Sequence, residues 1–147
     1  KGNEAMKKMG QLALLTTMSL LVALPAWPQQ EERQLNMREI MLSVIAPMTN
    51  KIWAATEIQT DTQWQELEQA AMTVLAVGSL IEQGGPDGAY KEQAKNADWQ
   101  AFTQQMMSAA RSALHAIGNH DEEALFRAGN EALYPPCENC HKAYLPK

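Results

Sequence analysis

Two cysteines and a histidine in the last fifteen residues have the types and spacing of a covalent haem site. The segment Cys137-Glu138-Asn139-Cys140-His141 reads C-x-x-C-H, which is the attachment pattern of c-type haem. In such a segment the two thiols add across the two vinyl groups of haem and form thioethers. The adjoining imidazole then becomes the proximal ligand of the iron. The sequence therefore predicts one covalent haem c, anchored by Cys137 and Cys140 and ligated by His141.

Other interpretations of these cysteines compete with haem attachment. A thioredoxin-type C-x-x-C would start a helix after a strand, and no strand pattern precedes this segment. A structural zinc site would need further ligands, and the only other histidines, His115 and His120, lie about twenty residues upstream. A haem-free helical protein with one disulfide would leave His141 without a role. We favour haem attachment because the chain has only these two cysteines and because the segment at residues 1–26 is predicted to be an export signal.

The opening of the chain is typical of a secretory signal. A pair of lysines precedes an uncharged run rich in Leu, Ala and Met, residues 9–24, and Ala26 follows as a small residue at its exit. We expect residues 1–26 to be a cleaved signal peptide, in which residues 1–5 lie upstream of the true start. Residues 27–147 would then be the exported domain. The alternative is an uncleaved membrane anchor, since a spanning helix needs roughly 17–25 residues.

Composition excludes several functional classes. The formal net charge is −5 and no cluster of Lys and Arg is present, so nucleic-acid binding has no support. No Ser-His-Asp arrangement, phosphate-binding glycine loop or convincing carboxylate pair occurs. We therefore expect a protein that is not an enzyme. A length of 147 residues suits a single folded domain.

Helical periodicity covers the first half of the exported domain. Apolar residues recur at helical spacing within residues 31–59, and Pro47 is expected to kink or split this helix because it lacks an amide donor. A second helix is predicted from Thr62 onward, with Thr62 and Gln65 in the form of a capping box. The glycine- and proline-rich segment 84–88 is predicted to end it.

Two more helices follow. The third has its apolar face along residues 99–116 and is expected to stop at Gly118 and Asn119. The fourth begins at about Asp121, and a Pro pair at 135–136 is expected to break the chain just before the haem segment. Four amphipathic helices with short connections predict an all-α fold, an antiparallel four-helix bundle with haem attached near its C-terminal end. Small residues on the second and third helices would permit close helix approach or leave space for a flat ligand.

The haem segment followed by Tyr144, at the end of a fourth bundle helix, resembles the cytochrome c′ family, including its low-spin relatives. The likeness covers residues 31–147, and only the C-x-x-C-H segment is specific. The resemblance implies a periplasmic protein with haem packed inside the bundle, the two cysteines as anchors and His141 as proximal ligand. It also implies a homodimer as one outcome, formed through the first two helices. The chain departs from the family at Leu145, where members commonly carry a basic residue.

The resemblance further implies that a first-helix side chain faces the distal side of the haem. That side chain is apolar in five-coordinate members and a methionine ligand in low-spin members. Met37 and Met41 lie four residues apart and so share a helix face. A thioether is a soft iron ligand, although methionines on such a face are more often core filling. Met41 is the first candidate for the distal ligand and Met37 the second, whereas Met48 lies beyond the proline. An apolar neighbour such as Leu42 would leave the iron five-coordinate.

The remaining polar and aromatic residues are expected to lie on the solvated surface or in the core. Arg38 and Lys51 suit haem propionates, but a solvated helix face is the more common explanation. His115 and His120 are expected to face solvent. Three of the four tryptophans are expected to pack in the core, against the porphyrin in one arrangement; they are Trp53, Trp64 and Trp99.

These observations predict a periplasmic c-type cytochrome with one haem that carries single electrons with a His141/Met axial pair. Its partners would be redox proteins that bind transiently and present a basic patch to its acidic surface. The protein would contact a membrane only if its signal segment were retained. The alternative function is a five-coordinate haem protein that binds nitric oxide or carbon monoxide as a scavenger or sensor.

Overall fold

The computed structural model describes residues 34–145. The expected signal peptide, residues 1–26, lies outside the described residues. The chain divides into two units between residues 32 and 33, and all of the described residues belong to the second. No helix in this described part is both long enough and apolar enough to cross a membrane.

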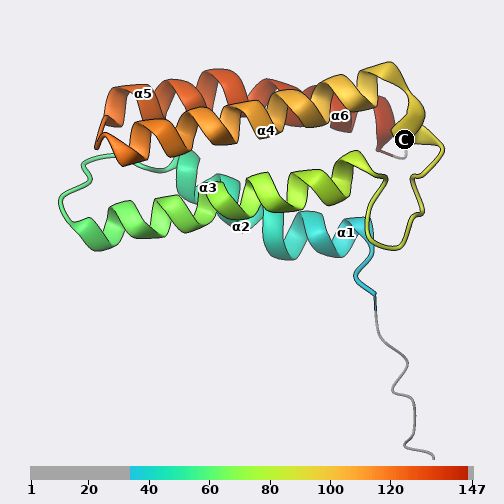
Figure 1. Cartoon of the computed structure of the whole chain (residues 1–147), viewed down its shortest axis with the longest axis horizontal. Helices are drawn as coiled ribbons and strands as arrows, with labels where there is room; N and C mark the ends of the chain where they lie inside the picture. Colours follow the sequence, from blue (N-terminus) through green and yellow to red (C-terminus); the bar gives the residue numbers. More distant parts are fainter. Residues whose placement is uncertain (1–33, 146–147) are drawn as a thin grey trace, which may run out of the picture. The chain divides into compact units, whose positions relative to one another are not determined.

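Residues 34–145 form helices and turns, with no β-strand among them. The helices are α1 (Met37–Ile40), η1 (Met41–Ile45), α2 (Ala46–Trp53), α3 (Asp61–Glu82), η2 (Gln93–Lys95), α4 (Ala97–Gly118), α5 (Glu122–Phe126), η3 (Arg127–Leu133) and α6 (Tyr134–Tyr144). Because η1 and η3 are π-helical and run on into their neighbours, the pieces join into four long helical segments. These segments are α1–η1–α2, α3, α4 and α5–η3–α6. They lie side by side and alternate in direction (Figure 1), as an antiparallel bundle requires.

Side-chain caps set where the helices begin. Thr60 caps α3, since its hydroxyl accepts from the Gln63 N–H at 3.2 Å and the Gln63 amide oxygen accepts from the Thr60 N–H at 3.0 Å. The predicted capping box of Thr62 and Gln65 is therefore wrong by two residues. The earlier start places Asp61 in the first turn, where its charge complements the helix dipole. Asp121 caps α5, since its carboxylate accepts from the Ala124 N–H at 2.8 Å, and the helix begins close to the predicted start at about Asp121.

Glycines end the two long central helices. Gly84 and Gly85 follow α3 with φ of 95° and 88°, which a residue with a side chain rarely adopts, and this confirms the predicted break at 84–88. The last residue of α4 is Gly118, and Asn119 follows it as C-cap, as predicted. His120 then takes φ of 52° in the turn before α5.

The prolines interrupt helical hydrogen bonding without ending the helices. Pro47 lies near the start of α2, directly after the π-helical η1, so the expected interruption takes the form of a change in helix type. The predicted break at Pro135 and Pro136 is wrong, because η3 continues directly into α6. In this π-helical stretch the Tyr134 N–H bonds the Gly129 carbonyl five residues back, and both prolines occupy the first turn of α6. Proline has no N–H, so at these two positions the helix continues without a donor to the preceding turn.

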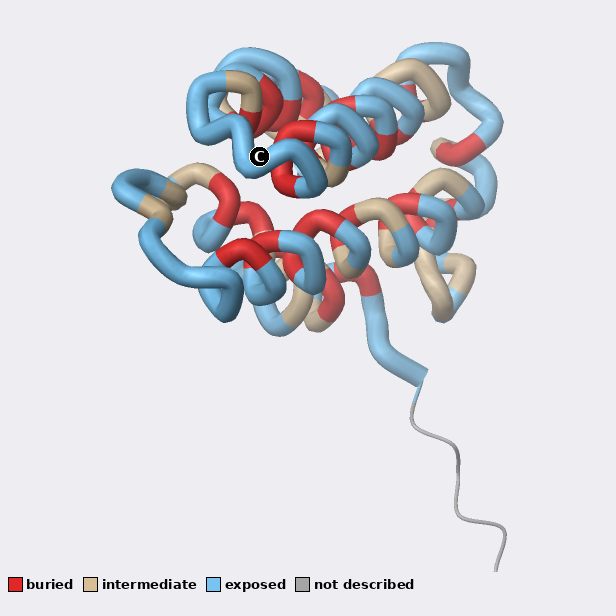
Figure 2. Tube along the Cα trace, turned by 60° about the vertical axis from the view of Figure 1, so that its left-hand side comes forward, coloured by how far each residue is buried: buried red, intermediate tan, exposed pale blue. Residues whose placement is uncertain are grey.

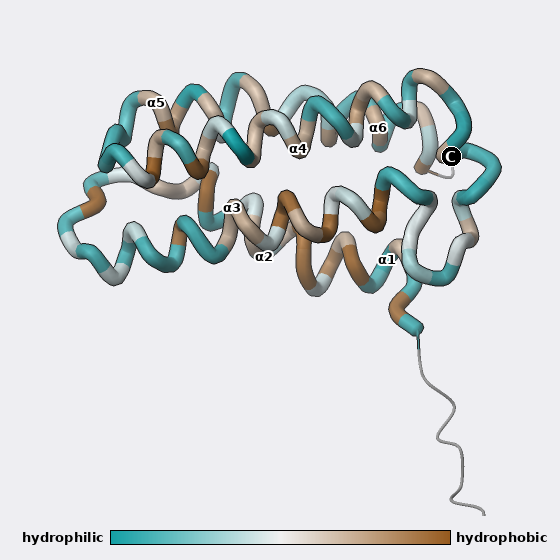
Figure 3. The backbone as a smooth tube through the Cα atoms, in the orientation of Figure 1, coloured by the Kyte–Doolittle hydropathy of each residue, from teal (hydrophilic) through white to brown (hydrophobic). Residues whose placement is uncertain are grey.

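The core lies between the four helical segments. Buried residues face one another across the bundle (Figure 2), and the apolar parts of the helices follow the same sides (Figure 3). The expected small residues on α3 and α4 are buried, including Ala71, Ala109 and Ala113. At Gly78 the helices approach so closely that an added Cβ would lie 2.6 Å from Met107 Cγ. The small residues therefore serve close packing of α3 against α4.

Candidate functional site

One face of α6 presents the three residues of the predicted haem segment. Cys137, Cys140 and His141 are spaced i, i+3 and i+4, so they share a helix face. All three line an apolar cavity of about 240 Å³. The wall opposite α6 comes from the first helical segment, α3 and α4, and includes Met41, Leu42, Ile45, Thr49, Trp53, Ile81, Phe102, Thr103 and Met106. The fold thus brings the C-x-x-C-H residues into one space with a first-helix methionine.

The two thiols are free and half-buried at the cavity wall. The Cys137 thiol donates to the Leu133 carbonyl at 3.2 Å. Burial, with a smaller contribution from the charge of Cys140, raises the pKa of the Cys137 thiol to about 11. Burial and the nearby Asp98 charge also raise the pKa of Cys140. Both thiols therefore stay protonated at neutral pH in the folded chain.

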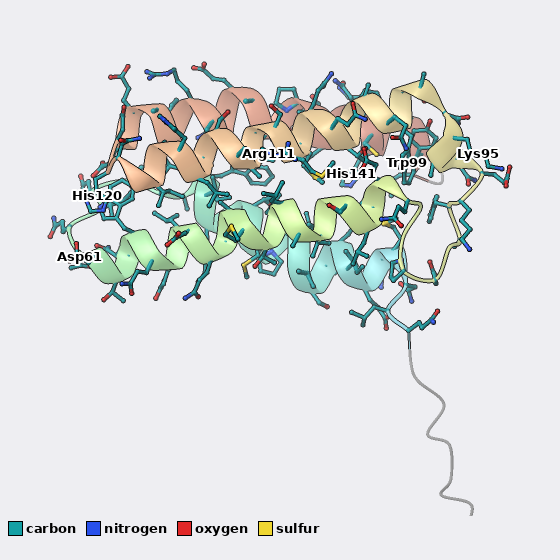
Figure 4. The ribbon with its side chains drawn as sticks, in the orientation of Figure 1. Asp61, Lys95, Trp99, Arg111, His120 and His141 are labelled. Carbon is teal, nitrogen blue, oxygen red and sulfur yellow. The ribbon has the colours of Figure 1, made fainter. Side chains whose placement is uncertain are left out.

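His141 lies on the exposed side of the cavity, at the end of the bundle that also holds Trp99 (Figure 4). It also borders a second, more open hollow with Trp53, Tyr134 and Leu145. Leu145 is the C-cap of α6 and is 57% exposed, so the position where the cytochrome c′ family commonly has a basic residue is occupied here by an exposed apolar side chain. The imidazole is thus reachable from the cavity and from the outer surface.

The structure separates the three first-helix methionines. Met41 is half-buried and lines the cavity, as does its neighbour Leu42, which is 56% exposed. Met37 is buried elsewhere: its Cε lies 2.9 Å from where a Cβ on Gly85 would be, so it packs under the loop after α3. Met48 packs against the core and does not line the cavity. Among the methionines named from the sequence, only Met41 lines this cavity.

The charged candidates lie on solvated surfaces. Lys51 is exposed and its ammonium is 3.6 Å from the Glu66 carboxylate on α3. Arg38 is exposed on α1, in the solvated position that the sequence favoured. His115 and His120 are both exposed, as expected, and His120 lies at the opposite end of the bundle from His141 (Figure 4). Neither histidine lines the cavity.

The tryptophans have three different environments. Trp64 and Trp99 are buried, as expected, and the ring of His120 stacks on Trp64 with centroids 4.8 Å apart. Trp53 is half-buried in the cavity wall, and its indole N–H donates to the Gly129 carbonyl at 2.9 Å. That bond joins the first helical segment to the fourth beside the cavity. Among the tryptophans of residues 34–145, Trp53 is therefore the one that lines the cavity.

Several residues of the cavity wall are not recognisable from the sequence as site residues. Phe102 and Met106 belong to the apolar face of α4 and have the spacing of ordinary core residues. Thr49 and Thr103 are buried in the wall, and each hydroxyl donates at 3.0 Å to the carbonyl four residues earlier, Ile45 and Trp99 respectively. These four residues become part of the cavity wall through the packing of the helices against one another, which the sequence does not show.

The donors and walls of the cavity fit a haem. The Thr49 and Thr103 hydroxyls bond carbonyls of their own helices, so they offer no free polar group to the cavity, and the wall is effectively apolar. No buried side-chain nitrogen or oxygen among residues 34–145 lacks a hydrogen-bond partner. The cavity is partly open, with the exposed residues Leu42 and His141 in its lining, so a flat ligand larger than its volume has room to extend outward. In the described part of the chain, no three His, Cys, Asp or Glu side chains group to hold a bare metal ion. Haem iron needs only axial ligands from the protein, and His141 and Met41 are of the right types.

Comparison of the chain with protein-family models, with curated proteins and with solved structures finds no match. Kinship with the cytochrome c′ family therefore remains a prediction from the C-x-x-C-H segment and its position in the helical pattern.

Proposed function

We propose that this chain is a c-type cytochrome with one haem that carries single electrons. The observation that carries the proposal is the meeting of Cys137, Cys140 and His141 with Met41 around one apolar cavity. Two thiols and an imidazole on one helix face are the groups that covalent haem attachment requires. Bound there, haem c would supply an iron that takes up and releases one electron.

Each side chain has a defined part in this proposal. Cys137 and Cys140 would anchor the group covalently, which keeps it bound in an exported protein. His141 would be the proximal ligand and Met41 the distal ligand, and a thioether paired with histidine raises the reduction potential. The apolar wall, with Phe102 as one member, would exclude water from the distal side.

Electron exchange needs a surface that a partner can approach. His141 and the aromatic ring of Tyr134, which is 50% exposed, border the same open hollow. The net charge of −5 favours a basic partner that binds transiently, with a rate that falls as salt is added. Location in the periplasm is part of the proposal and depends on the signal segment, residues 1–26.

A second function has one observation in its favour. Leu42 lines the cavity beside Met41, and a wall of this kind would also shelter an open iron position. With Leu42 rather than Met41 toward the iron, the protein would bind nitric oxide or carbon monoxide. The two functions differ in the sixth ligand, and so in spin state.

The test is to co-express the full chain with cytochrome maturation factors and to record visible spectra with and without carbon monoxide. We expect haem that survives acid–acetone extraction in the unaltered chain and is lost in the Cys137→Ser, Cys140→Ser double variant. Sharp low-spin bands that carbon monoxide does not move would support the electron carrier. Met41→Ala should then abolish those bands, whereas the matched change Met48→Ala should leave them.

Two outcomes would contradict this proposal at different levels. High-spin bands that shift with carbon monoxide in the unaltered chain would refute the Met41 ligand and favour gas binding. A chain without covalent haem, produced beside a control cytochrome that matures normally, would refute both functions.

A further inference from the structure

Tyr144, the last residue of α6, is held by three contacts to the beginning of α4. Its hydroxyl donates to Asp98 Oδ1 at 2.6 Å and accepts from the side-chain amide of Asn96 at 3.2 Å. Its ring meets Trp99 edge to face, with centroids 4.9 Å apart. Asp98 also accepts from the Trp99 backbone N–H at 2.8 Å, so the carboxylate that holds Tyr144 is itself fixed. These contacts fix the last turn of α6 to α4.

At the start of α4, the side chain of the N-cap residue bonds Tyr144 and does not cap its own helix. Asn96 occupies the N-cap position, where asparagine is among the most stabilising residues. Its side chain makes no capping hydrogen bond and instead reaches Tyr144, which lies 48 residues further along the chain. The Asn96 side chain therefore contributes its hydrogen bond to Tyr144 and none to the first turn of α4.

The last turn of α6 contains the predicted proximal ligand. The Leu145 N–H donates to the His141 carbonyl at 3.0 Å, so fraying of this turn would release the backbone of His141. Leu145 is 57% exposed and beyond the α-helix, so it adds little packing. Tyr144 is therefore the side chain of this turn that joins it to the rest of the bundle.

We propose that Tyr144, held by Asp98 and Asn96, is a positioning residue that fixes the last turn of α6 and thereby the direction of the His141 imidazole. The inference rests on the proposed function, because it takes His141 to be the proximal ligand. It assigns Tyr144 no contact with the iron. Tyr144 holds the His141 imidazole in one orientation and is not itself a ligand.

The experiment compares Tyr144→Phe with Tyr90→Phe in the haem-loaded full chain. Both changes remove one phenolic hydroxyl from a ring packed on Trp99, since Tyr90 stacks on that indole with centroids 5.6 Å apart. The Tyr90 hydroxyl makes no hydrogen bond within residues 34–145, so Tyr90→Phe is the matched control. The measurements are amide hydrogen exchange at Leu145 and the electron paramagnetic resonance signal of the oxidised protein.

We expect Tyr144→Phe to speed exchange at Leu145 by about tenfold, the loss expected for one exposed charge-assisted hydrogen bond. We also expect its resonance signal to broaden or divide as His141 takes more than one orientation. Tyr90→Phe should leave both measurements unchanged. A merely structural role would lower the melting temperature and leave the signal sharp, and that result would overturn the proposal.

The proposal can fail separately from the proposed function. If the unaltered chain carries haem and the two variants behave alike, only the role of Tyr144 is refuted. If the unaltered chain carries no covalent haem, the proposed function fails and the role of Tyr144 as a positioning residue fails with it.

Discussion

Replacement of Gly78 by alanine tests the close approach of α3 and α4, on which the cavity depends. An added Cβ would lie 2.6 Å from Met107 Cγ and 3.2 Å from Met106 Cε. Met107 is 6% exposed, and its Cγ is next to the backbone end of the side chain, so relief requires a new rotamer in a packed site. Met106 lines the cavity, so the same change reaches the candidate site.

The magnitude follows from two opposed contributions. Alanine in place of glycine inside a helix stabilises by about 1 kcal/mol, mostly by restricting the unfolded chain. Forcing a methyl group into a packed core costs about 1–3 kcal/mol. Because the nearest contact is far below van der Waals distance, we expect the cost to exceed the gain. The net result is a loss of roughly 0.5–2 kcal/mol in unfolding free energy, or roughly 2–8 °C in melting temperature.

The assay is urea unfolding of the haem-loaded chain, followed by circular dichroism, with Gly118→Ala as the control. Gly118 ends α4 and has no heavy atom within 4 Å of its added Cβ, so this substitution should raise the urea midpoint. Gly78→Ala should lower the midpoint and also perturb the visible spectrum through Met106. Equal stabilisation by both substitutions would show that α3 and α4 are not in close contact at Gly78, and the packing argument would be wrong.

Three further results are expected from single perturbations. Trp53→Phe should lower unfolding free energy by about 1 kcal/mol, since the hydrogen bond to the Gly129 carbonyl is lost; an unchanged urea midpoint would contradict this. Thr60→Ala should cost about 1 kcal/mol by removing the cap of α3, measured in the same way. The third result concerns Cys137, whose pKa is about 11 in the folded chain against an ordinary value of 9.0. Between these two pH values the folded chain keeps a thiol proton that the unfolded chain releases, so a rise in pH favours unfolding. Haem-free chain should therefore lose stability as pH rises from about 9 to about 11. Cys137→Ser should lose less in urea titrations at each pH, because only the raised pKa of Cys140 then remains, and haem-loaded chain should lose less still.

Local chemistry determines much of this protein from sequence alone. The four helical segments, the glycine break at 84–88 and the start of the fourth segment near Asp121 depend on neighbouring residues, so the sequence predicts them to within a few residues. The common face of Cys137, Cys140 and His141 is also local, because helix geometry fixes it once the segment is helical. The predicted break at the Pro pair failed for the opposite reason: whether a π-helical stretch absorbs the prolines depends on what the neighbouring helices hold in place.

Only the tertiary structure decides what faces the haem segment. The four-residue spacing puts Met37 and Met41 on one helix face, so the sequence can rank them but cannot show which one meets α6. In the structure Met41 lines the cavity, and Met37 packs beneath the loop at Gly85 instead. Phe102 enters the cavity wall for the same reason, because side chains on an apolar face become core or wall according to the neighbour they meet. The C-x-x-C-H segment thus carries by itself the side chains on which the proposed chemistry depends. The packing of the other helices specifies its opposite wall, since that wall is built from residues distant in the chain.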